Sequence, residues 1–262
     1  MELGLTSKSA IVTGGAQGIG AAIVAGFVKE GVNVVIGDVD IDAARELSEQ
    51  LGNGETKVLA VKTDVTQKAD ADELVSCTVT EFGKIDILVN DAAFPPIEVP
   101  FDELEEKDWD RTIDVSAKGT FLVSQAVVPH MKAARNGKII NLSSSAGMRG
   151  FATVSAYCVA KFGVRALTQV LALELAEYNI NVNALAPGIV RTPLWEFILD
   201  TQSERGGEPR EQIFKDRVTE AIPLNRPQEP EDIANLVMFL SSDISRNITG
   251  ETININGGQI LG

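Results

Sequence analysis

The chain has very little histidine and cysteine. Its 262 residues contain one histidine, His130, and two cysteines, Cys77 and Cys158, which are far apart in the sequence. A catalytic zinc site takes three protein ligands and an open position, so these residues cannot build one, and we expect no metal. Two cysteines in a chain of this length also indicate a reducing compartment, so the predicted location is the cytoplasm.

Positive charge is also scarce. Lysine and arginine total 23 against 37 aspartate and glutamate residues, which gives a formal net charge of −14. Such a chain repels phosphate backbones and anionic lipid surfaces, so we expect neither a nucleic acid nor a membrane as partner. Residues 1–10 lack a basic run followed by an apolar core, and no later apolar run is long enough to span a bilayer. We therefore expect no signal peptide and no membrane span.

What the sequence does contain is a regular alternation of apolar runs and helical patterns, with 44% hydrophobic residues. Continuous apolar strands separated by helices indicate a parallel sheet covered on both faces. We predict an α/β, doubly wound parallel sheet (a Rossmann fold) in a single domain over residues 1–262. One long helix is predicted at 103–131, with Trp109, Ile113, Phe121 and Val127 on a buried stripe and a length suited to packing against a second subunit. The predicted strands are 10–12, 32–36, 57–62, 85–89, 138–142, 180–185 and 251–255, and the other helices are 21–30, 41–51, 68–82 and 230–240.

The first predicted strand runs into a glycine-rich turn at 13–20, TGGAQGIG, which opens the first helix. Glycines let a backbone approach a pyrophosphate, and the free N–H groups of a helix N-terminus attract its charge. Asp38 ends the second strand, 20 residues after Gly18, where a carboxylate accepts hydrogen bonds from an adenosine ribose and repels a 2′-phosphate. No Lys or Arg stands in the turn or directly after Asp38, so we predict NAD. The alternatives are an ordinary tight turn and a helix cap, which Asp40 could provide by itself.

Further polar residues stand where other strands end. Ligands of such sheets bind outside the carboxyl ends of the strands, so Asp64 and Asn90 are candidates for adenine and nicotinamide-side contacts. Either could instead cap the turn that follows it. Pro187 and Gly188 end the strand at 180–185 and open a loop beside the expected cofactor.

The candidate catalytic residues are Ser144, Tyr157 and Lys161. In a helix, Tyr157 and Lys161 project from one face, and an ammonium beside a phenol brings its pKa of about 10 towards neutral pH. Ser144 would steady an oxygen that gains or loses a proton. This set, which has no histidine, suits interconversion of an alcohol and a ketone. The alternative is an amphipathic helix with a buried tyrosine and a solvated lysine.

Residues 194–222 are polar and charged, with Gly206-Gly207 at the centre and aromatic residues along short helical pieces. We expect a lid over a substrate pocket, with Trp195 contacting the substrate. The alternative is a surface insertion that packs against a neighbouring subunit.

Taken together, these motifs resemble the short-chain dehydrogenase/reductase family along nearly the whole chain. The matching pieces are residues 13–20, Asp64-Val65, 90–93, Ser144 with Tyr157 and Lys161, 187–193 and the stretch 249–258. The resemblance implies a doubly wound fold, often tetrameric, in which Tyr157 is the general acid/base. It implies that Ser144 orients the substrate oxygen and that Lys161 lowers the tyrosine pKa and holds the nicotinamide ribose. The cofactor residues so expected are Gly14, Gln17, Gly18, Ile19, Gly20, Asp38, Asp64, Val65, Asn90, Ala92, Tyr157, Lys161, Pro187, Gly188, Val190 and Thr192.

The chain departs from the family pattern at three places. Ser116 stands where members usually carry an asparagine of the proton relay, and we expect it to keep that catalytic role. The usual Asn-Asn-Ala-Gly reads Asn90-Asp91-Ala92-Ala93, which crowds the cofactor slightly, and Asn256 replaces an aspartate. None of these touches the acid/base pair.

The substrate is expected by resemblance alone. Trp195 and residues 206–209 are similar to members that oxidise vicinal diols, acetoin-type hydroxyketones and sugar alcohols, which predicts NAD-dependent oxidation of a small polar polyol or diol. The alternatives are a larger apolar substrate (3-oxoacyl, steroid or terpenoid alcohol) and a catalytically idle cofactor-binding regulator.

Overall fold

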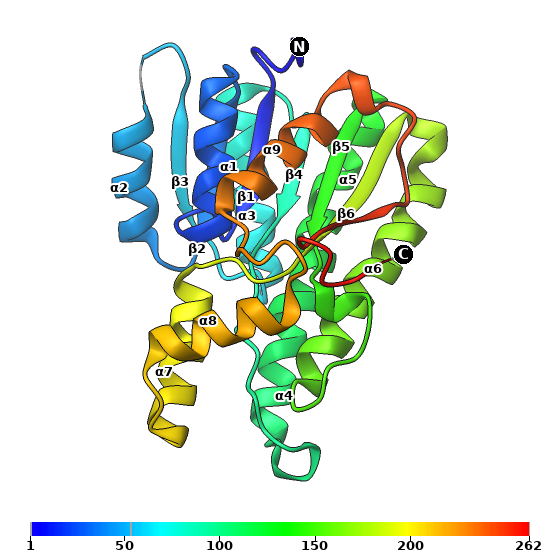
Figure 1. The fold of residues 1–262 in the computed structure, drawn as a ribbon. Coiled ribbons are helices and arrows are strands. Elements are labelled where there is room, and N and C mark those ends of the chain that lie inside the picture. The colour runs from blue at the N-terminus through cyan, green and yellow to red at the C-terminus, as the bar shows by residue number, and fades with distance from the viewer. Residues whose placement is uncertain (1, 53, 262) are drawn as a thin grey trace.

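The computed structural model describes residues 2–52 and 54–261; the ends of the predicted domain, residues 1 and 262, and residue 53 lie outside the described residues. The described chain forms one seven-stranded sheet in the order β3-β2-β1-β4-β5-β6-β7, in which every pairing is parallel (Figure 1). This confirms the predicted α/β fold. The strands are β1 Ser9–Thr13, β2 Asn33–Asp38, β3 Val58–Lys62, β4 Ile87–Asn90, β5 Gly137–Leu142, β6 Ile180–Pro187 and β7 Thr252–Ile255.

Helices cover both faces of the sheet (Figure 1). Apolar side chains of α1, α2 and α9 form one buried cluster against the sheet, and those of α3, α5 and α6 form a second cluster on the opposite face. Both clusters include fully buried strand residues, which explains why the strands read as continuous apolar runs. The helices are α1 Gly18–Lys29, α2 Ile41–Leu51, α3 Lys68–Phe82, α4 Glu106–Ile113, α5 Gly119–Ala134, α6 Ser155–Leu175, α7 Pro193–Gly206, α8 Arg210–Ala221 and α9 Pro230–Ser241, with short 3-10 turns at Phe101–Glu103, Ser145–Gly147, Ala176–Tyr178 and Asp243–Ser245.

Local capping fixes several helix ends at the predicted residues. Asp40 caps α2, since its Oδ1 accepts the N–H of Ala43 at 3.1 Å. Gly83, in the left-handed conformation with φ 74°, ends α3. Because Asp40 takes the capping role, Asp38 is free for another one.

The long predicted helix at 103–131 is wrong in detail. It begins at Glu106, and a π-helical turn, Asp114–Lys118, separates α4 from α5. The wider π turn shifts the faces of the two helices relative to each other. As a result Phe121, which was predicted to be buried, is 44% exposed, while Ser116 inside the π turn is buried.

One helix contradicts the expectation that no apolar run of the chain is long enough to span a bilayer. The segment Ser155–Tyr178 is long and apolar enough to cross a membrane when judged by length and composition alone. A core helix of a folded domain passes the same test, and this one contributes Ala172 and Leu175 to the second buried cluster and contains the buried Lys161. We therefore assign it to the core.

The sheet reverses its direction of winding next to β1. β1 pairs with β2 on one side and with β4 on the other, so the chain builds the sheet outwards in both directions from this point. In doubly wound sheets a crevice forms at such a reversal, outside the carboxyl ends of the strands.

Candidate active site

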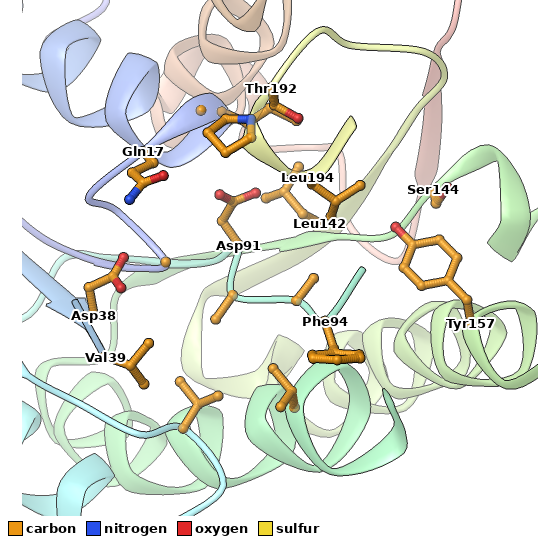
Figure 2. Close-up of a pocket in the computed structure, with 18 of the residues that line it drawn as sticks. Gln17, Asp38, Val39, Asp91, Phe94, Leu142, Ser144, Tyr157, Thr192 and Leu194 are labelled. Atoms are coloured by element: carbon orange, nitrogen blue, oxygen red, sulfur yellow. The ribbon is translucent and has the colours of Figure 1, made fainter. Parts of the chain in front are cut away.

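A cavity of about 890 Å³ lies at the carboxyl ends of the central strands, and α7 contributes to its wall (Figure 2). This volume is in the range of small-molecule and cofactor sites. Nearly all the predicted site residues line it, namely Gly14, Gln17, Gly18, Ile19, Asp38, Asp64, Val65, Ala92, Ser144, Tyr157, Lys161, Pro187, Gly188, Val190, Thr192 and Trp195. Gly20, Asn90 and Ser116 are the predicted residues that do not.

Two glycines of the glycine-rich turn pack too closely against neighbouring backbone to carry a side chain. Gly14 has φ +66°, and a Cβ there would lie 2.8 Å from the Cα of Ala92. A Cβ on Gly20 would lie 2.2 Å from the carbonyl oxygen of Gly14. Gly20 therefore packs against Gly14 without lining the cavity, whereas Gly14 and Gly18 line it.

The carboxylate of Asp38 is held by the same turn. Its Oδ2 accepts the N–H of Ala16 at 3.0 Å, and its Oδ1 accepts the N–H of Asp40 at 3.0 Å. The neighbouring lining residues Val39 and Asp40 carry no positive charge. One end of the cavity is thus negatively charged.

The two strand-end candidates have structural partners. Asp64 caps the turn after β3, because its Oδ1 accepts both the N–H and the hydroxyl of Thr66, at 3.0 and 2.8 Å, while the residue still lines the cavity. Asn90 is 4% exposed, and its Nδ2 donates to Ser124 Oγ at 3.0 Å and to Asn141 Oδ1 at 2.8 Å. The Nδ2 of Asn90 therefore joins α5 to β5 inside the core, while its Oδ1 is buried without a hydrogen-bond partner, and the predicted cofactor contact of Asn90 stays a prediction.

Tyr157 and Ser144 meet at the other end of the cavity (Figure 2). The Ser144 side chain lies beside the phenol of Tyr157 and acts to lower the phenol's pKa. The Ser144 oxygen also accepts the N–H of Ala146 at 3.1 Å, which fixes its position at the start of a 3-10 turn. The two hydroxyls can therefore bind one oxygen atom of a ligand.

Lys161 lies one helical turn after Tyr157, but it does not act on the phenol as expected. Its ammonium donates to the carbonyl oxygen of Leu142 at 2.7 Å and lies 5.6 Å from the centre of the Tyr157 ring. Burial raises the pKa of Tyr157 to about 12, and burial lowers the pKa of Lys161 to about 8. In this structure desolvation outweighs the attraction between ammonium and phenolate.

Ser116 contacts neither the lysine nor the tyrosine. Its Oγ accepts the backbone N–H of Phe94 at 3.1 Å. The serine thus fixes the segment after β4, which places Phe94 in the cavity wall. The predicted role of Ser116 in the proton relay stays a prediction, and the structure adds this positioning contact to it.

Several residues that line the cavity were not assigned to the site by sequence reasoning, among them Asp91 and Phe94 (Figure 2). The signal for Asp91 was present, because it stands at one of the three departures from the family pattern, but we interpreted that stretch only as crowding. Phe94 had no signal, since an aromatic residue after a strand is indistinguishable from a core residue.

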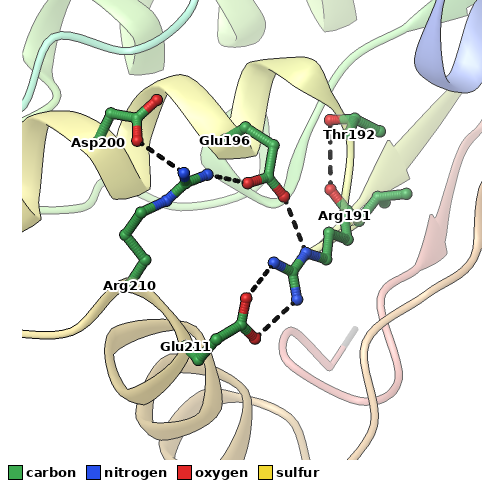
Figure 3. A network of polar contacts seen from close by, with 7 residues as sticks. Arg191, Thr192, Glu196, Asp200, Arg210 and Glu211 are labelled. Carbon is green, nitrogen blue, oxygen red and sulfur yellow. Dashed lines mark hydrogen bonds and ion pairs between the residues drawn. The ribbon is translucent and has the colours of Figure 1, made fainter.

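The predicted lid consists of α7 and α8, which share a small apolar core containing Leu199, Phe214 and Val218. Trp195 lines the cavity and packs edge-on against Phe214, with ring centres 6.0 Å apart. Ion pairs join the loop after β6 to both helices, since Arg191 pairs with Glu196 of α7 at 2.8 Å and with Glu211 of α8 at 2.5 Å (Figure 3). Other ion pairs join the two helices to each other, since Arg210 of α8 pairs with Glu196 and, at 3.0 Å, with Asp200 of α7. Glu98, in the segment after β4, accepts Gln202 at 2.6 Å and Arg217 at 3.0 Å.

These residues fit a dinucleotide. Gly14 and Gly18 of the turn line the cavity, Asp38 stands at one end of it, and Ser144 with Tyr157 stands at the other. The backbone of the turn and the N-terminus of α1 would hold the diphosphate, and Asp38 would hold the adenosine ribose.

Comparison with known proteins identifies the family of the chain. Residues 14–259 match the family described as Enoyl-(Acyl carrier protein) reductase. Galactitol 2-dehydrogenase of Agrobacterium fabrum is 40% identical over 258 residues, which cover 97% of this chain and 98% of the relative. A 3-oxoacyl-acyl carrier protein reductase of Thermotoga maritima is 36% identical, over 98% and 99% of the two chains. The crystal structure of levodione reductase superimposes with a TM-score of 0.91 at 28% identity, over 97% of this chain and 98% of that one. The chain therefore belongs to the short-chain dehydrogenase/reductase family, whose members are oxidoreductases that use a nicotinamide cofactor.

Proposed function

We propose that this enzyme transfers a hydride between NAD and the secondary alcohol of a small polar polyol, diol or hydroxyketone. The observation that carries the proposal is the pair of hydroxyls, Ser144 and Tyr157, at the opposite end of one cavity from the carboxylate of Asp38. The similarity to galactitol 2-dehydrogenase supports a polyol, and the absence of positive charge at Val39 and Asp40 supports NAD.

In the proposed mechanism the substrate hydroxyl binds between Ser144 and Tyr157. The phenolate of Tyr157 accepts the hydroxyl proton while Ser144 donates a hydrogen bond to the oxygen that becomes a carbonyl. Bound NAD would supply the hydride acceptor and a positive charge that favours the phenolate. Lys161 holds the nicotinamide ribose in this proposal, from its fixed position on the Leu142 carbonyl.

A larger apolar substrate is the second candidate, and the cavity wall favours it. Phe94, Leu194 and Trp195 line the cavity together with the catalytic hydroxyls, and the family match carries an acyl carrier description. Such a wall suits an alkyl or ring system better than a chain of hydroxyls.

A substrate panel separates these candidates. We expect NADH to form with galactitol, sorbitol or 2,3-butanediol at alkaline pH, with kcat/KM at least about tenfold above that for cyclohexanol or a 3-hydroxyacyl thioester. The measurement is NADH absorbance, repeated with NADP in place of NAD. The reverse order of activity would establish the second candidate, and no turnover with any member while NADH still binds would establish the idle regulator.

We also propose that α7 and α8 cover the bound substrate. Trp195→Ala should raise KM for the preferred alcohol about tenfold and change kcat much less, because lost packing weakens ground state and transition state equally. Phe197→Ala is the matched control, since Phe197 lies on the same helix and is 43% exposed. An unchanged KM in Trp195→Ala would show that this helix does not cover the substrate.

The remaining proposals concern the whole protein. We infer one domain over residues 1–262 and a homotetramer, which is supported by exposed apolar side chains on α5 and α6: Phe121, Val159, Phe162, Val170 and Leu173. We infer a cytoplasmic location from the free thiols of Cys77 and Cys158.

A further inference from the structure

Glu98, in the segment after β4, makes polar contacts with both α7 and α8. Its Oε2 accepts the side-chain N–H of Gln202 at 2.6 Å and the guanidinium of Arg217 at 3.0 Å. Its carbonyl oxygen accepts the guanidinium of Arg205 at 2.6 Å. Gln202 and Arg205 belong to α7, and Arg217 belongs to α8. One residue thus joins both helices to the body of the domain.

The contacts on α7 lie far from the residue at which this helix begins. α7 starts at Pro193, and its first turn is held to the preceding loop by the ion pair between Arg191 and Glu196. Gln202 stands nine residues after Pro193, which is about 14 Å along the helix axis at 1.5 Å per residue. Glu98 therefore holds the end of α7 that the loop after β6 does not reach.

The segment that carries Glu98 is itself fixed on both sides. Before Glu98, the N–H of Phe94 donates to Ser116 Oγ at 3.1 Å, and Phe94 lines the cavity. After Glu98, the N–H of Val99 donates to the carbonyl oxygen of Thr153 at 3.0 Å, in the loop before α6. The helices are thus held against a fixed segment that also forms part of the cavity wall.

The carboxylate is partly shielded from water. The side chain of Glu98 is 21% exposed, against 46% for Arg217. A hydrogen bond between two charged groups is stronger than one between neutral groups, and shielding reduces its screening by salt. If α7 and α8 moved away, a partly buried carboxylate would lose both side-chain donors, which is unfavourable. The contact therefore favours the arrangement in which both helices lie against the wall.

We propose that Glu98 is a positioning residue for the substrate: it holds the end of α7, together with α8, against the cavity wall and so keeps Trp195 at the substrate end of the cavity. Glu98 does not line the cavity, whereas Trp195 does, so Glu98 acts on a ligand through the helices. The proposal rests on the proposed function, in which α7 and α8 cover the bound substrate.

The direct test is amide hydrogen exchange of the full chain, followed by mass spectrometry with neither substrate nor dinucleotide added. In Glu98→Ala we expect peptides from residues 200–221 to exchange about tenfold faster, because the end of α7 and α8 lose a common anchor. Glu98→Gln keeps an acceptor oxygen without the charge, so its exchange rate should lie between those of Glu98→Ala and the wild type.

Glu103→Ala is the matched control, because Glu103 is an exposed glutamate that follows Glu98 by five residues and does not line the cavity. We expect its exchange rates to equal those of the wild type. Equal acceleration in Glu103→Ala and Glu98→Ala would overturn the proposal.

A variant on α8 keeps the test valid if Glu98→Ala does not fold. Arg217→Gln removes the ion pair from the more exposed side, and it should accelerate exchange of the α8 peptides about threefold or more. If exchange over residues 200–221 is unchanged in those of these variants that fold, Glu98 does not hold the helices.

The KM for the substrate provides a readout that a general loss of structure would not reproduce. Glu98→Ala should raise KM for the preferred alcohol about fivefold and change NADH binding less than about twofold. In a Trp195→Ala background the same substitution should raise KM less than about twofold, because the side chain that Glu98 positions is already absent. An equal rise in both backgrounds would refute the positioning role. If no member of the substrate panel turns over, the proposed function fails, and hydrogen exchange still decides whether Glu98 holds the helices.

Discussion

Replacing Tyr157 with phenylalanine is expected to lower kcat about 10³-fold or more while NADH binding changes less than about twofold. The substitution removes one oxygen atom and leaves the ring, so the cavity keeps its shape. It removes the group that exchanges a proton with the substrate and the partner of the Ser144 side chain. Turnover is measured by NADH absorbance and binding by NADH fluorescence.

The second tyrosine of the chain provides the control. Tyr178 lies in the 3-10 turn after α6, where its ring contacts Lys132 and Arg135 rather than the cavity. Tyr178→Phe should therefore keep wild-type turnover. If Tyr157→Phe retained a substantial part of the wild-type kcat, the phenol would not be the acid/base.

Removing the charge of Asp38 is expected to change the choice of cofactor. Asp38→Ala should raise the ratio of kcat/KM with NADP to kcat/KM with NAD about 10²-fold, because like charges at close range cost several kcal/mol. Use of NAD should also fall, since the carboxylate holds the N–H groups of Ala16 and Asp40. Initial rates with both cofactors at several concentrations give the ratio.

Two neighbouring substitutions make this result specific. Asp38→Asn removes the charge but keeps an acceptor oxygen, and it should give an intermediate ratio. Asp42→Asn should leave the ratio unchanged, because Asp42 lies in the first turn of α2 with its side chain 91% exposed and does not line the cavity. A wild type that already prefers NADP would refute our interpretation of Asp38.

The sequence was most informative where structure depends on neighbours along the chain. The limits of α2 and α3 were predicted to the residue, and two of these four ends have a local cap, Asp40 before α2 and the left-handed Gly83 after α3. The strands were recognisable because burial on both faces requires continuous apolar runs.

The contacts that the sequence did not predict join residues that are distant in the sequence. The partner of Asn90 is Asn141 on another strand, and that of Ser116 is the backbone of Phe94. A polar residue at a strand end can face the cavity or the core, and no local pattern distinguishes the two. The pKa of Tyr157 depends likewise on how much of the fold surrounds it, so the spacing to Lys161 could not predict its direction.

The separate apolar core of α7 and α8 has a consequence for how such an enzyme diversifies. The groups that exchange the proton are anchored in the sheet and α6, whereas the cover depends on its own side chains and on a few surface ion pairs. On the proposed function, substitutions in α7 and α8 would thus alter which alcohol is accepted while leaving the reacting groups in place. New specificities are accessible to this scaffold without redesign of its chemistry.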